Sequence, residues 1–85
     1  MSGLNHEMRV EALRDRIFAA LARGDENAAR KGIKQLHRAV PAEAAGLRTA
    51  LYIEAGRAQE ALAAWKKCEA YAPHEPYTVF LRARI

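Results

Sequence analysis

The sequence predicts an all-α fold of about five helices, arranged as antiparallel helix-turn-helix repeats like a fragment of an α-solenoid. One reason is a pattern that occurs twice, 32 residues apart, with the same internal spacing in both copies. Another is that apolar residues recur every three or four positions between the turns, as on one face of a helix. The pattern comprises Gly24, Ala29, Ile33, Leu36 and Pro41 in the first copy and Gly56, Ala61, Trp65, Cys68 and Pro73 in the second.

The first pair of helices is expected on either side of Gly24. The first helix should run from about residue 6 to residue 22, with Asn5 as its N-cap. Gly24 can adopt the positive φ that reverses the chain, and Asp25 should cap a second helix to about residue 39. The apolar stripes of these helices are Val10, Leu13, Ile17 and Leu21, then Ala29, Ile33, Leu36 and Val40.

The second pair is expected on either side of Gly56. Pro41 ends the second helix because it cannot donate a backbone hydrogen bond there, and a third helix should follow it to about Ala55. The third helix carries Leu47 and Leu51, with Ala50 and Ile53 beside them. A fourth helix, from about Ala58 to Ala72, should turn its larger and smaller apolar residues inward, namely Ala61, Leu62, Trp65, Cys68 and Tyr71.

A short fifth helix should close the domain. Pro76 suits the first position of a helix that runs from Tyr77 to about Arg84. Tyr77, Phe80 and Leu81 are expected to cover the exposed face of the preceding pair, while Val79 and Ile85 stay exposed.

The repeated residues resemble those of the tetratricopeptide repeat. The second copy is the better match, because Tyr52 lies four residues before Gly56, where the family usually has an aromatic residue. The first copy has Ala20 in that place and Gly32 inside its second helix, and the repeat is shorter than the usual length of about 34 residues. The resemblance implies one domain, 1–85, with repeat one at about 6–41, repeat two at about 42–73 and a capping helix at about 76–85.

The resemblance also implies a function, because such repeats present a concave groove to a protein or peptide partner. We therefore expect an adaptor or small chaperone that holds a helix or extended peptide, with apolar anchors and charged residues that fix its direction. Alternatively, Phe18 and Leu21 belong to the core and not to the groove, and the exposure of their side chains distinguishes the two possibilities. The groove residues that the resemblance implies are Glu11, Arg14, Phe18, Leu21, Ala22, Glu43, Gly46, Ala50, Ile53 and Glu54.

Two other functions compete with this one. The chain could self-assemble through its end faces into a homo-oligomer, which would involve Phe80 or Leu81. The net charge of +4 and the basic run Arg30, Lys31, Lys34, His37 and Arg38 raise nucleic acid as a partner. No aromatic residue interleaves with this run to stack on bases, so a solvated helix face is the favoured interpretation.

Composition excludes several further classes. The one cysteine, Cys68, allows no internal disulfide, and no apolar run is long enough to cross a bilayer. The N-terminus lacks the features of a secretion signal, so a cytoplasmic setting is expected. His6, His37 and His74 lie on separate segments without metal-ligand spacing, and Ser2 is the only serine. We expect no metal, no cofactor and no enzymatic activity.

Overall fold

The computed structural model describes the backbone of residues 2–85 and the side chains from residue 7 onward. It confirms the all-α prediction within this range, since every regular element there is a helix. The five helices are α1 (Ser2–Ala22), α2 (Glu26–Ala39), α3 (Pro41–Glu54), α4 (Ala58–Tyr71) and α5 (Pro76–Arg84).

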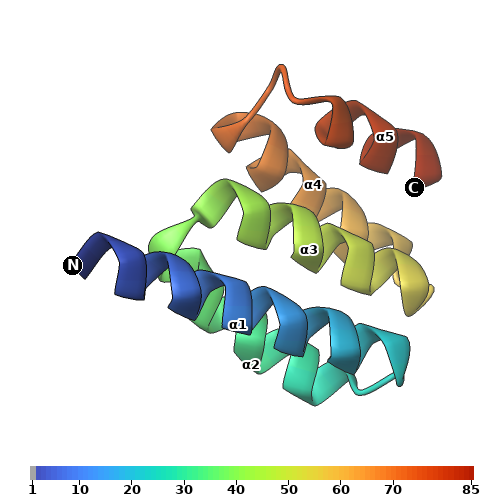
Figure 1. Ribbon diagram of the computed structural model, residues 1–85. Helices are drawn as coiled ribbons and strands as arrows, with labels where there is room; N and C mark the ends of the chain where they lie inside the picture. The colour runs from blue at the N-terminus through green and yellow to red at the C-terminus, as the bar shows by residue number, and fades with distance from the viewer. Residues whose placement is uncertain (1) are drawn as a thin grey trace.

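The helices pack in the order in which they occur along the chain. As Figure 1 shows, α1 and α2 form one antiparallel pair, α3 and α4 form the next, and α3 also packs against α2. The last helix, α5, packs against both α3 and α4.

Local signals account for most helix boundaries. The side chain of Asp25 accepts a hydrogen bond of 3.1 Å from the backbone nitrogen of Ala28, which confirms its predicted capping role. Pro41 and Pro76 each occupy the first turn of their helix, where a missing N–H costs nothing. The prediction for Asn5 is wrong, because α1 begins at Ser2 and so places Asn5 within the helix. No proline stands there to end the helix, and the helical backbone continues to the second residue.

The two interhelical turns repeat in space as they do in sequence. Gly24 and Gly56 have φ angles of 74° and 73°, the positive values that the sequence predicts. After each glycine a backbone N–H reaches back five residues to a carbonyl, from Asp25 to Ala20 at 2.8 Å and from Arg57 to Tyr52 at 2.9 Å. The same backbone geometry thus recurs 32 residues along the chain.

Small residues allow the helices to approach closely. Ala29 and Ala61 are both fully buried, as predicted, and so are Ile33, Leu36 and Cys68. A methyl group on Gly32 would lie 2.6 Å from Cγ1 of Ile17, well inside van der Waals contact. The glycine inside α2, which weakens the resemblance to the repeat family, therefore has a packing reason. The main buried cluster comprises Val10, Ile17, Ala20, Ala29, Ile33, Leu36, Ala44 and Leu51.

The terminal helix is attached through polar as well as apolar contacts. The indole nitrogen of Trp65 donates a 2.7 Å hydrogen bond to the backbone oxygen of Thr78, and the buried Thr78 hydroxyl donates to the backbone oxygen of Ala72 at 2.8 Å. Leu81 is buried against the preceding pair, as expected. The prediction is wrong for Phe80, which is 60% exposed, because it lines an open hollow beside α3 and does not pack into the core.

Two further expectations about exposure need correction. Tyr71 was expected to point inward from α4, but it is 50% exposed, since it lies in the last turn where α4 passes the end of α3 and leaves the core. Ile85 is half-buried rather than exposed, whereas Val79 is 67% exposed, as expected.

Candidate functional site

A concavity lies between α3 and α5, bounded also by the ends of α2 and α4, and we call it the α3–α5 groove. Its volume is about 850 Å³, and its lining is mostly apolar. The lining residues are Ala39, Val40, Pro41, Ala42, Glu43, Gly46, Leu47, Ala50, Tyr71, Ala72, Glu75, Tyr77, Phe80 and Leu81.

Gly46 shapes this groove by admitting the ring of Tyr77. A Cβ at Gly46 would lie 3.1 Å from Cε2 of Tyr77, so a larger residue would push the ring outward. Burial raises the pKa of Tyr77, and the neighbouring Cys68 adds to the rise. A tyrosine hydroxyl is neutral at physiological pH even without this rise, and the ring of Tyr77 forms part of the apolar wall of the groove.

Two carboxylates, Glu43 and Glu75, are the charged groups of the groove lining. Glu43 already has a partner, because Nε of Arg14 donates to both of its oxygens at 2.7 and 2.9 Å. These hydrogen bonds raise the pKa of Arg14, which therefore remains charged. Glu75 forms no ion pair among the side chains that the structure describes.

The Arg14–Glu43 pair changes what these two residues can do for a partner. The sequence assigned both to orienting a ligand, but in the structure they join α1 to α3. Both side chains are about one-third exposed, so a ligand could reach them only by competing with an existing ion pair. Their structural part is to connect the first helices of the two pairs.

The other predicted groove residues lie away from the α3–α5 groove, with the exception of Gly46 and Ala50. Phe18 is 53% exposed on α1, which excludes the alternative that places it in the core, whereas Leu21 packs against the core cluster. Glu11 and Ala22 are exposed on α1. Ile53 lies beside Arg84 and Ile85 at the far end of α5. Of the predicted groove residues, Glu43, Gly46 and Ala50 line the α3–α5 groove.

Sequence reasoning missed the contribution of α5 to the groove. Tyr77 and Phe80 were assigned to covering the last helix pair, and nothing in their spacing showed that a hollow would remain beside them. The available signal was Gly46, because a glycine within a helix often permits close approach of another side chain. It did not indicate which side chain approaches.

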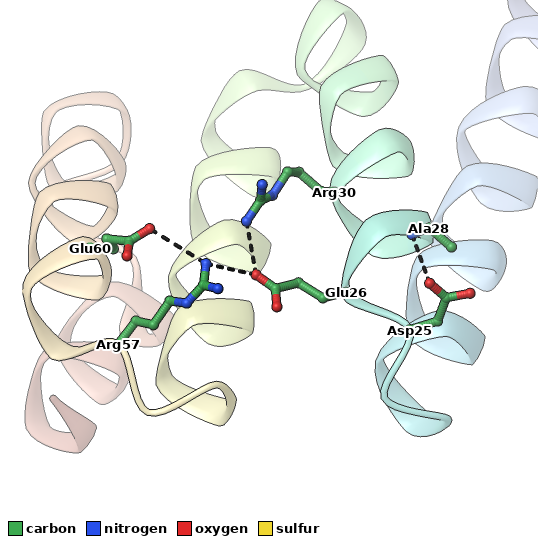
Figure 2. A network of polar contacts seen from close by, with 6 residues as sticks. All are labelled: Asp25, Glu26, Ala28, Arg30, Arg57 and Glu60. Atoms are coloured by element: carbon green, nitrogen blue, oxygen red, sulfur yellow. Dashed lines mark hydrogen bonds and ion pairs between the residues drawn. The ribbon is translucent and has the colours of Figure 1, made fainter.

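Ion pairs elsewhere link the two helix pairs (Figure 2). Oε1 of Glu26 accepts a hydrogen bond from Arg30 at 2.8 Å and forms an ion pair with Arg57 at 2.9 Å, and Arg57 also lies 3.7 Å from Glu60. Arg57 belongs to the second turn and Glu26 to the start of α2, so this network bridges successive units. Arg30 is thereby paired and does not contribute a free charge to the predicted basic run.

The described residues offer little reactive chemistry. They contain no cluster of three side chains suited to a metal ion, and none of their helices is both long and apolar enough to span a membrane. Cys68 is fully buried, and its sulfur lies 3.7 Å from the Thr78 hydroxyl. The side chains of Ser2 and His6 lie outside the described part of the chain.

Comparisons of the whole chain with protein-family models, with curated proteins and with solved structures find no match.

Proposed function

We propose that this chain is a tetratricopeptide-like interaction module, an adaptor or small chaperone that holds a helix or peptide of another protein. The observation that carries the proposal is the α3–α5 groove, which combines about 850 Å³ of mostly apolar space with an exposed aromatic ring, Phe80, at its edge. Grooves of this kind accept the apolar face of an amphipathic helix.

The likeness to tetratricopeptide repeats has support from backbone geometry. The residues that end the second helix of each pair, Val40 and Ala72, have similar φ angles of −138° and −145°. Each donates its N–H to the carbonyl four residues earlier, at Leu36 and at Cys68. Two units with the same turns and caps, followed by the first helix of a third, are the arrangement that the repeat family would give.

The charges of the groove favour a partner with a basic residue next to its apolar stripe. Glu75 lies at the groove without an ion pair among the described side chains, and Glu43 is already held by Arg14. A partner Lys or Arg beside Glu75 would fix the direction in which the helix lies, while Phe80, Tyr77 and Leu47 would supply the apolar contact.

The test is selection of a binding peptide from a displayed library of amphipathic sequences of about 16 residues, followed by titration of variants. Phe80→Asp should weaken the selected peptide by at least about tenfold, because interface aromatics are typical hot spots. Phe18→Asp is the matched control, since Phe18 is similarly exposed but lies outside the groove. Equal losses in both variants, or a selected peptide that perturbs amides away from α3 and α5, would contradict the proposal.

A second candidate is self-assembly through α5. Val79 is 67% exposed on α5, next to the 60% exposed Phe80 at the groove edge, and adjacent exposed apolar residues at the end of a helical array favour stacking between copies. Solution mass measured over a hundredfold concentration range decides the matter. A mass that rises with concentration and falls back to the monomer in Val79→Asp supports assembly, and a constant monomer excludes it.

A further inference from the structure

A second hollow lies where α2, α3 and α4 meet, and its charge is of one sign. Its volume is about 470 Å³, and we call it the basic hollow. Three helices each contribute a cation to its lining, and no carboxylate lines it. The lining residues are Lys34, His37, Arg48, Lys67, Ala70 and Tyr71.

These cations have no ion-pair partner, in contrast to five of the ten arginines from residue 7 onward. The arginines at positions 14, 23, 30, 57 and 84 each lie within 4.0 Å of a carboxylate. No such pair involves Lys34, Arg48 or Lys67 among the side chains from residue 7 onward. Arg48 is also half-buried, so water screens its charge less than that of a fully exposed arginine.

His37 adds an imidazole to the same hollow. Its Nδ1 atom is buried and has no hydrogen-bond partner, and its ring meets Tyr71 edge to face with 6.1 Å between centroids. Because Nδ1 is shielded, Nε2 is the ring nitrogen available to a ligand. The packing against Tyr71 holds the ring in place at the wall of the hollow.

We propose that the basic hollow is a binding site for a phosphate group. Three convergent cations match a multiply charged phosphoryl group better than a single carboxylate, and an arginine beside two lysines combines a planar donor fork with two point charges. The site does not depend on the proposed function, because it shares only Tyr71 with the α3–α5 groove.

The test is a titration of the ¹⁵N-labelled chain with inorganic pyrophosphate at constant ionic strength. Amide shifts should saturate and should centre on residues 34, 37, 48 and 67. The double variant Lys34→Gln, Lys67→Gln should weaken binding by at least about tenfold, since hydrogen bonds to charged groups contribute strongly. Both lysines are exposed, so this variant keeps the fold.

The matched control is the double variant Arg38→Gln, Lys66→Gln, which removes the same charge from exposed positions on the same two helices outside the hollow. It should change the affinity by less than about threefold, because charges that do not touch the ligand act only through a screened field. Equal weakening in both double variants would show a diffuse basic surface, and shifts that do not saturate would show no site. Either result overturns the proposal.

A short single-stranded oligonucleotide distinguishes a nucleic-acid phosphate from a small free one. Binding tighter than pyrophosphate, with loss in the lysine variant but not in the control, identifies a nucleic-acid backbone as the source. If the affinity for the oligonucleotide does not exceed the affinity for pyrophosphate, the ligand is a small phosphate compound. If both double variants reduce oligonucleotide binding equally, the oligonucleotide contacts a diffuse basic surface and not the basic hollow. That result overturns the site.

Discussion

Replacing Gly32 with alanine tests the close approach of α2 to Ile17 on α1. In the middle of a helix, glycine to alanine ordinarily stabilises by about 1 kcal/mol through helix propensity. Here the new methyl group would lie 2.6 Å from Cγ1 and 3.4 Å from Cδ1 of Ile17. Ile17 is fully buried, so its side chain cannot move into solvent. Overpacking of this kind costs about 1 to 3 kcal/mol, and the net effect should be a destabilisation of about 1 kcal/mol.

The assay is urea unfolding followed by far-ultraviolet circular dichroism. A loss of about 1 kcal/mol should also lower the melting temperature by about 4 to 8 °C in a domain of this size. Gln35, exposed on the same helix, provides the control, because Gln35→Ala and Gln35→Gly measure the propensity difference without a clash. If Gly32→Ala stabilises the protein as much as alanine does over glycine at position 35, the packing argument is refuted.

Three further predictions concern single polar contacts. Thr78→Val removes the hydrogen bond to the Ala72 carbonyl and should destabilise the fold by about 1 to 2 kcal/mol in urea unfolding, with the isosteric side chain keeping the packing. The hydrogen bond from the Ala28 nitrogen lowers the pKa of Asp25 below its ordinary value of 3.8. The ionised Asp25 side chain therefore stabilises the folded protein above that pH, and this stabilisation is lost as the pH falls through the lower pKa of the folded state. Asp25→Asn, which can still cap, should therefore reduce the drop in melting temperature between neutral pH and the acid range, and an unchanged pH profile would contradict this. Glu26→Gln should cost less than about 1 kcal/mol at low salt and nothing measurable in 1 M salt, since both of its arginine partners are largely exposed.

Local signals predict the helices well because they act within a few residues. The Asp25 cap, the prolines at 41 and 76, and the two turn glycines each fix a boundary through backbone chemistry, and the structure confirms them. The error at Asn5 has the same origin. A capping residue marks a position where a helix can begin, but it does not prevent the helix from beginning earlier, as α1 does at Ser2.

The candidate sites depend on contacts that spacing does not reveal. Arg14 and Glu43 are 29 residues apart and were assigned to a ligand, but they pair with each other across two helices. The basic hollow combines Lys34 and His37 with Arg48 and Lys67, and the sequence did not show that these residues of three helices lie together. Tyr77 reaches Gly46 because α5 turns back over α3, and the direction of that turn follows from tertiary packing.

The position of Trp65 has a consequence for how unfolding will be observed. The chain has one tryptophan, and its ring lies at the junction of α4 and α5, bound to Thr78 and within 5.6 Å of the Arg82 guanidinium. Fluorescence therefore reports the C-terminal end of the molecule, whereas circular dichroism averages over all five helices. Because α5 packs on α3 and α4 whereas α1 packs mainly on α2, the C-terminal end can separate while α1 and α2 remain folded. A difference between the two midpoints would be the spectroscopic sign of an array that unfolds from one end.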